Sequence, residues 1–141
     1  MKDEFYISMD KSKMNVPFIH KYLSEHSYWA KGRTINRVKL SIEHSLCFGV
    51  FNKNNEQLGF ARITTDYVTV AWLMDVFISK THQGKGLGKL LIDYVVNLPE
   101  LKEVRGIGLK TIDAQKLYKQ FGFKNIDNPE IWMMKMNESI E

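Results

Sequence analysis

A glycine-rich segment at residues 83–89 joins an apolar stretch of the chain to an amphipathic one. Apolar residues before it predict a buried strand, and those after it recur at helical spacing up to Leu98. Backbone amides at such a helix start lack intrahelical acceptors, and glycines let an anion approach them closely. We therefore expect a phosphate or pyrophosphate group to bind to Gln83, Gly84, Lys85, Gly86, Leu87, Gly88 and Lys89.

Two common phosphate-binding patterns do not fit this segment. A dinucleotide fingerprint that began at Gly84 would need a glycine where Lys89 stands. A Walker-type loop would need Ser or Thr where Leu90 stands. A tight turn whose glycines only satisfy backbone geometry remains an alternative.

Composition predicts one folded domain over residues 1–141 and limits its partners. The net charge is +4, from 20 basic and 16 acidic residues, which favours anionic ligands but is small for a nucleic-acid binder. The single cysteine, Cys47, excludes an internal disulfide, and the four histidines show no metal-ligand spacing. The chain start lacks a signal-peptide pattern, and the apolar run 68–78 is too short to span a membrane. We expect a cytoplasmic protein that binds no metal, nucleic acid or membrane.

The order of apolar patterns predicts an α/β chain. Alternation of apolar and polar residues indicates strands, and spacing of three or four indicates helices. Thr34 is a candidate helix cap, and Gly122 stands where a helix needs a left-handed residue. The expected strands are 5–9, 46–51, 57–65, 68–78, 104–110 and 131–136, and the expected helices begin near Val16, Thr34, Leu87 and Ala114.

The spacing of Gln83, Gly86 and Gly88, together with the segment from Ala114 to Phe123, resembles two separated motifs of the GNAT N-acetyltransferases. The central motif of that family has Gln or Arg, then two residues, Gly, one residue, and Gly or Ala, which Gln83, Gly86 and Gly88 match. The family's second feature is a strand followed by a short helix that ends in Gly and Phe. This feature is matched by Ala114, Leu117, Tyr118, Gly122 and Phe123.

The resemblance implies a GNAT-like fold and acetyl-CoA as co-substrate. The implied fold is a mixed, mostly antiparallel sheet of six or seven strands with about four helices. Amides of the glycine segment would hold the pyrophosphate, while the pantetheine arm would lie along Val76, Phe77 and Ile78, whose amides would polarise the thioester carbonyl. The family's Asn contact to pantetheine would fall to Thr111, or to Asp113.

Tyr118 and Asp75 are the candidate catalytic residues. The resemblance places Tyr118 beside the cofactor sulfur as general acid, although its helical spacing also fits a core tyrosine. Asp75 is the only acid in the apolar stretch 68–78 and is our candidate general base. A structural carboxylate that accepts hydrogen bonds from a neighbouring loop is the alternative for Asp75.

The sequence thus predicts an N-acetyltransferase that transfers acetyl from acetyl-CoA directly to a primary amine. The acceptor is a small molecule or a peptide that the sequence does not identify. The sequence is compatible with a monomer and with a homodimer. A noncatalytic acyl-CoA binding or sensing module is the alternative function. An acceptor pocket could be lined by residues between the first two predicted helices and by residues near the end of the chain, namely Tyr28, Trp29, Arg33, Trp132 and Met134.

Overall fold

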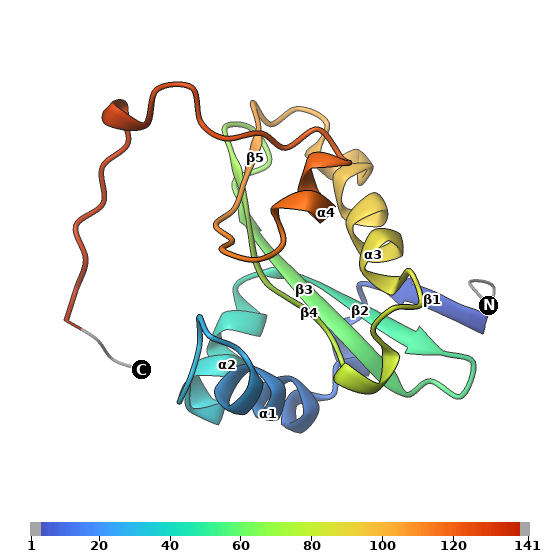
Figure 1. Cartoon of the computed structure of the whole chain (residues 1–141). Coiled ribbons are helices and arrows are strands. Elements are labelled where there is room, and N and C mark those ends of the chain that lie inside the picture. The colour runs from blue at the N-terminus through green and yellow to red at the C-terminus, as the bar shows by residue number, and fades with distance from the viewer. Residues whose placement is uncertain (1–3, 139–141) are drawn as a thin grey trace.

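The computed structural model describes residues 4–138, in which a five-stranded sheet lies between two layers of helices (Figure 1). The strands are β1 (Phe5–Ser8), β2 (Leu46–Asn52), β3 (Gln57–Thr65), β4 (Ala71–Ile78) and β5 (Ile107–Gly108). The α-helices are α1 (Val16–His26), α2 (Ile35–Glu43), α3 (Leu87–Val96) and α4 (Gln115–Lys119). Short 3-10 turns are η2 (Lys11–Lys13), η3 (Lys80–His82), η4 (Pro99–Leu101) and η5 (Pro129–Ile131).

The sheet is mixed, with the strands in chain order. β1 to β4 pair antiparallel with their neighbours, and β5 pairs parallel to β4 at the edge. The predicted α/β class and the hairpin of β2 and β3 are confirmed. The predicted six or seven strands are wrong for the described part, which has five.

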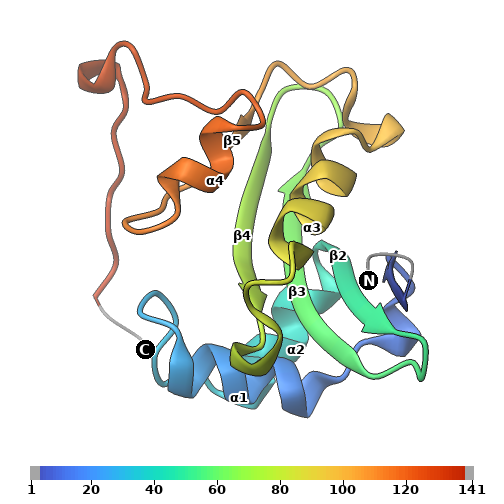
Figure 2. The same cartoon turned by 45° about the vertical axis from the view of Figure 1, so that its right-hand side comes forward.

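Two hydrophobic clusters hold the layers together, one on each face of the sheet. The cluster under α1 and α2 contains Ile19, Leu23 and Val38, each no more than 1% exposed. The cluster under α3 and α4 contains Leu91 and Val95, which are fully buried. Figure 2 shows α3 lying across the face of β2 to β4 that α1 and α2 leave uncovered. β2 and β3 are therefore buried on both faces.

Local turn chemistry sets most helix ends where the sequence predicts them. The Asn15 side chain accepts a hydrogen bond from the Phe18 amide at 3.1 Å, and Thr34 Oγ1 accepts one from the Arg37 amide at 3.3 Å. Gly122 follows α4 with a φ of +90°, in the left-handed region. These caps confirm the expected starts of α1 and α2.

β4 is shorter than its apolar run. The Asp66 carboxylate accepts hydrogen bonds from the amides of Val68 and Thr69, at 2.9 and 2.7 Å. This turn occupies the amides that would extend the strand, so β4 begins at Ala71.

The predicted strand at 131–136 is wrong for the isolated chain. These residues form the end of η5 and an extended segment that leaves the body of the molecule (Figure 1). The predicted strand 104–110 shrinks to Ile107–Gly108, because only these two residues pair with β4. Both differences concern strand pairing, which depends on a partner segment and not on local pattern.

Candidate functional site

The glycine-rich segment forms a bend between η3 and α3, directly after β4. Gly84 and Gly86 have φ values of +81° and +82°, which side-chain-bearing residues rarely adopt. Within residues 4–138, the backbone amides of Gly86, Leu87, Gly88 and Lys89 donate no hydrogen bond. The segment therefore presents a row of unpaired donors at the positive end of a helix, which suits an anion.

The bend is tied to its neighbours on both sides. The Gln83 side-chain amide donates to the carbonyl of Ile78 at 3.0 Å, so it fixes the bend to the end of β4. A β-carbon at Gly88 would lie 3.8 Å from Leu117 Cδ2, which shows that α4 packs against the start of α3. The two sequence motifs are therefore brought together in space.

β4 and β5 part after two paired residues. Ala71 pairs with Ile107 and Trp72 with Gly108, and the remainder of β4 has no strand on that side in the part of the chain described. Backbone groups of Val76, Phe77 and Ile78 on that edge can therefore bind an extended ligand. Gly106 leaves open space beside this opening, but the ring of Trp72 covers the position that a β-carbon at Gly108 would take.

A β-bulge interrupts β4 in the middle of this edge. Phe60 pairs with Phe77 and Arg62 with Met74, so two residues of β4 oppose Ala61 alone. Asp75 lies in the bulge with a φ of +56°. Bulges change the direction of the backbone and often lie beside functional sites. A non-glycine residue keeps a left-handed conformation only because the surrounding structure holds it there.

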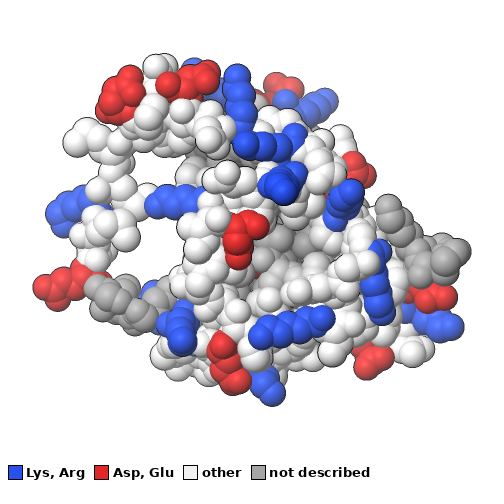
Figure 3. Space-filling model, viewed as in Figure 1, with Lys and Arg blue, Asp and Glu red and all other residues white. Residues whose placement is uncertain are grey.

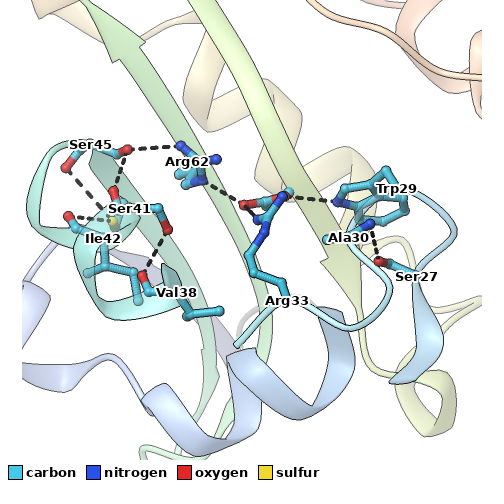
Figure 4. Close-up of polar contacts among 11 residues, drawn as sticks. Ser27, Trp29, Ala30, Arg33, Val38, Ser41, Ile42, Ser45 and Arg62 are labelled. Carbon is cyan, nitrogen blue, oxygen red and sulfur yellow. Dashed lines mark hydrogen bonds and ion pairs between the residues drawn. The ribbon is translucent and has the colours of Figure 1, made fainter. Parts of the chain in front are cut away.

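The Asp75 carboxylate is buried and accepts three hydrogen bonds. Trp29 Nε1 donates to Oδ1 at 2.9 Å, while Arg33 Nη1 and Arg62 Nε donate to Oδ2 at 2.9 and 2.6 Å. Arg62 also donates to Ser45 Oγ at 3.2 Å. Figure 4 shows Trp29, Arg33 and Arg62 converging on one point between α1, α2 and the sheet.

These contacts agree with the structural-acceptor alternative for Asp75. Two guanidinium groups form ion pairs with the carboxylate, and each of its oxygens already accepts a hydrogen bond. Trp29 and Arg33, which the sequence suggested for an acceptor pocket, instead fix the bulge of β4.

Tyr118 lies on α4 and is 7% exposed. Burial raises the pKa of its phenol to about 12, with smaller contributions from Tyr28 and Asp113. Within residues 4–138 the hydroxyl makes no hydrogen bond, although the ring packs edge-on against Phe123 at 5.6 Å. Tyr118 therefore keeps its proton throughout the physiological range.

Tyr28, a residue suggested for the acceptor pocket, lies close enough to Tyr118 to contribute to the raised pKa of its phenol. The Tyr28 hydroxyl accepts a hydrogen bond from the Ile112 amide at 3.1 Å, across 84 positions of the chain. Thr111 Oγ1 accepts one from the Ala114 amide at 3.0 Å, within the turn that precedes α4. The hydroxyl of Thr111 is thus engaged within its own turn, and no short sequence pattern predicts that Tyr28 meets Ile112.

A cavity of about 1000 Å³ is lined by Tyr118 and Thr111, but neither the glycine segment nor Asp75 lines it. It lies at the outer edge of β5, between α4 and the C-terminal segment. Four basic residues line it, namely Arg105, Lys110, Lys119 and Lys124, together with the aromatic residues Trp72, Phe123 and Trp132. Basic side chains are visible over this side of the molecule in Figure 3.

We expect Cys47 to be unreactive in the folded protein. Its side chain is buried, and burial raises the pKa of the thiol to about 11, so little thiolate is present at neutral pH. A thiol reagent such as 5,5′-dithiobis(2-nitrobenzoate) should therefore label it only after denaturation. Rapid labelling of the native protein would contradict this burial. The measurement also sets the background of any assay that detects released thiol.

The described residues also show neither a metal centre nor a membrane span. No group of three His, Cys, Asp or Glu residues between 4 and 138 is placed to hold a metal ion. None of the helices in that range has the length and apolar character needed to cross a bilayer.

The known sequences that this chain is similar to are acetyltransferases. The family model described as an acetyltransferase (GNAT) domain matches residues 43–125, more than half of the chain. An uncharacterized N-acetyltransferase of Gracilaria tenuistipitata is 31% identical over 125 residues, covering 74% of this chain and 68% of that protein. A proposed acetyltransferase of Gibberella zeae is 27% identical and covers 88% of this chain and 81% of its own length.

Solved structures show the same similarity. A GNAT-family protein from Xanthomonas campestris pv. campestris superimposes with a TM-score of 0.92 at 38% identity, covering 96% of this chain and 95% of that chain. Glucosamine-6-phosphate N-acetyltransferase from Arabidopsis thaliana shares the fold, with a TM-score of 0.65 at 13% identity over 97% of this chain and 99% of that chain.

Proposed function

The chain belongs to the GNAT acetyltransferase family and is an acyltransferase, and from this premise we propose that it transfers acetyl from acetyl-CoA to a primary amine. The observation that carries the proposal is the row of unpaired amides at Gly86 to Lys89, directly after a strand whose edge is open. Members of this family generally use acetyl-CoA. A diphosphate on the amides and a pantetheine arm along the strand would use both features at once.

The donor would lie along two backbone surfaces. Its pyrophosphate would accept hydrogen bonds from the bend at 84–89, with Lys85 and Lys89 adding positive charge. Its pantetheine arm would run along the free edge at Val76, Phe77 and Ile78. The bulge at Asp75 supports an amide turned toward the thioester carbonyl, because it breaks the regular alternation of donors along β4.

The proposed reaction is a direct transfer of the acetyl group, and each proton that moves is assigned a donor or an acceptor. A neutral amine attacks the thioester carbonyl, an N–C bond forms, the C–S bond breaks, and the amine loses one proton. The departing thiolate takes the proton of Tyr118, whose buried hydroxyl remains protonated with a pKa of about 12. We give Asp75 a positioning role, and solvent takes the proton of the amine.

Binding of the donor is tested by thermal unfolding with CoA. A ligand at a hundred times its dissociation constant stabilises the folded state by about 2.7 kcal/mol, so CoA should raise Tm clearly. Pantetheine, which lacks the pyrophosphate, should raise it much less. The same samples with acetyl-CoA and a panel of amines would release thiol if the protein is catalytic. A CoA-induced shift without thiol release from any amine would favour the sensing alternative.

Two glycines allow a matched test of the bend. Gly84 and Gly32 have φ values of +81° and +80°, and a β-carbon at either would meet no atom within 4 Å. Alanine at each should cost similar folding stability, on the order of 1–2 kcal/mol. Only Gly84→Ala should also reduce the CoA-induced shift, because only that bend would hold the diphosphate. Equal shifts for both variants would contradict the assignment of the pyrophosphate site.

A further inference from the structure

The loop between α1 and α2, residues 27–34, connects the two sides of the opening between β4 and β5. On one side it contacts the turn that precedes α4, where Tyr28 Oη accepts a hydrogen bond from the Ile112 amide at 3.1 Å. In two views the loop rises from the layer of α1 and α2 toward the start of α4 (Figures 1 and 2). We call these eight residues the α1–α2 loop.

Hydrogen bonds within the α1–α2 loop and to the end of α1 hold it in a defined shape. The Ala30 amide donates to Ser27 Oγ at 3.0 Å, and this hydroxyl donates to the Leu23 carbonyl at 2.6 Å. The Gly32 amide donates to the Ser24 carbonyl at 3.1 Å. Ala30 is fully buried. The loop is therefore a rigid connection, whose position follows that of α1.

On its other side the α1–α2 loop is fixed to β4. Trp29 Nε1 donates to Asp75 Oδ1, and Arg33 Nη1 donates to Asp75 Oδ2, both at 2.9 Å (Figure 4). Tyr28 directly precedes Trp29, and the two rings pack edge to face with their centroids 5.1 Å apart. The buried bulge of β4 therefore sets the place of the Tyr28 ring.

The start of α4 depends on contacts from outside the helix. α4 has five residues, and its N-cap residue, Ala114, makes no side-chain cap hydrogen bond. A helix this short is not stable by itself. The turn before it is held by Thr111 Oγ1, which accepts from the Ala114 amide, and by the Tyr28 hydroxyl. The Tyr118 amide donates to the Ala114 carbonyl at 3.3 Å, so the place of Tyr118 follows that of the turn.

The contact between Tyr28 and Ile112 lies at the surface. Tyr28 is 48% exposed and Ile112 76%. A hydrogen bond in such a place contributes little to folding stability, because water replaces the lost partner. The same contact joins the segment that carries Tyr118 to the loop that Asp75 anchors. Its main effect is therefore on the relative position of these two parts.

We propose that Tyr28 is a positioning residue, through which the β4 bulge sets the place of the general acid. Asp75 holds Trp29, the adjacent Tyr28 holds the turn at Ile112, and the turn places Tyr118. These contacts fix the distance between the β4 edge, where the thioester would lie, and the hydroxyl that would protonate its sulfur. The inference rests on the proposed function, in which Tyr118 is the general acid.

Steady-state kinetics of Tyr28→Phe test this role. We expect kcat to fall about 10- to 100-fold, because a displacement of about 1 Å can cost about 100-fold. The KM for acetyl-CoA and the CoA-induced rise in Tm should keep their wild-type values. Tyr67→Phe is the control, since Tyr67 is 44% exposed and lies in the turn between β3 and β4. A wild-type kcat in Tyr28→Phe would overturn the proposal.

Two further variants separate positioning from proton transfer by Tyr28 itself. Replacement of Tyr28 by O-methyltyrosine keeps the oxygen that accepts from Ile112 and removes the hydroxyl proton, so kcat should stay near the wild-type value. In a Tyr118→Phe background, Tyr28→Phe should lower kcat by less than about 2-fold, because residues that act through one another are not additive. A low kcat with O-methyltyrosine would refute positioning, as would a full additional loss in the double variant.

Amide hydrogen exchange tests the contact without any assay of activity. In the protein without ligands, Tyr28→Phe should speed exchange at the amides of Ile112, Leu117 and Tyr118, whereas Tyr67→Phe should not. Unaltered exchange would contradict the proposal even if no amine acceptor were found.

The kinetics also distinguish a failure of this inference from a failure of the proposed function. If Tyr118→Phe loses kcat and Tyr28→Phe does not, only the positioning role of Tyr28 is wrong. If Tyr118→Phe keeps the wild-type kcat, the general acid of the proposed function is wrong, and the positioning role is refuted with it.

Discussion

Asp75→Ala is expected to lower the free energy of unfolding by about 3–5 kcal/mol, the cost of breaking a buried ion pair from one side. The side chain of Asp75 is 2% exposed, and the side chains of Arg33 and Arg62 are 12% and 11% exposed. Removal of the carboxylate leaves two guanidinium charges facing one another without their shared anion. It also frees the left-handed residue of the bulge from the contacts that hold it.

Urea unfolding measures this loss, with an exposed carboxylate as the control. Asp127 forms an ion pair with Lys124 at 3.8 Å, with both side chains more than three-quarters exposed. Asp127→Ala should change the free energy of unfolding by less than about 1 kcal/mol. Equal losses for the two variants would mean that the buried cluster contributes no more than a surface pair.

The pH dependence of kcat in Asp75→Asn distinguishes the two roles considered for Asp75, general base and structural acceptor. If Asp75 were the general base, Asp75→Asn would lower kcat at neutral pH, and high pH would restore it by deprotonating the amine. We expect no such rescue. A positioning role predicts instead that Asp75→Asn loses stability and that its kcat stays below the wild-type value by a similar factor at every pH at which the protein is folded.

Tyr118→Phe is expected to lower kcat by about 100-fold or more, the usual contribution of a positioned general acid. The KM for acetyl-CoA should change little, because the phenol hydroxyl makes no hydrogen bond within the described residues. The ring remains, so its edge-on packing against Phe123 is kept. Steady-state kinetics by thiol release measure both constants.

The pH dependence of stability offers a second test of Tyr118. An unfolded tyrosine loses its proton near pH 10, while the folded Tyr118 has a pKa of about 12. Between these values the folded state holds more protons, so stability falls as pH rises. Burial also raises the pKa of Tyr22, which acts in the same direction. Tyr118→Phe should therefore flatten, but not abolish, the loss of stability above pH 10.

Tyr94→Phe provides the matched control for both measurements. Tyr94 lies on α3 and is 39% exposed, and it plays no part in the proposed transfer. Its variant should keep wild-type kcat and the wild-type alkaline slope. An unaltered kcat in Tyr118→Phe would refute the general acid, and would leave Tyr118 as a core residue of α4.

The glycine bend and the helix caps could be predicted because their causes lie within a few residues. The glycine-rich segment forms the turn before a helix that the sequence predicts, with Gly84 and Gly86 in left-handed conformations, and Thr34 caps α2 as expected. The apolar periodicity likewise predicted α1 and α3, and the structure places them on opposite faces of the sheet. The motifs around Gly86 and Tyr118 pointed to the family that the comparisons confirm.

The strand ends were predicted less well, because a strand needs a partner. The apolar pattern at 104–110 does not reveal that only Ile107–Gly108 would pair with β4. The pattern at 131–136 is that of a strand, yet the isolated chain offers it no neighbour. In both cases the intrinsic preference is local, while the hydrogen bonds depend on distant residues.

The sequence by itself determined the glycine bend, the order of strands and helices as far as α4, and the family, since each follows from turn chemistry, periodicity or a short motif. Only the tertiary structure decided the surroundings of the one acid in β4. Trp29, Arg33, Arg62 and Asp75 come from three elements or loops, and no spacing along the chain predicts that they meet. Burial of a carboxylate is compensated by whichever donors the fold brings to it, so its chemistry is a property of packing.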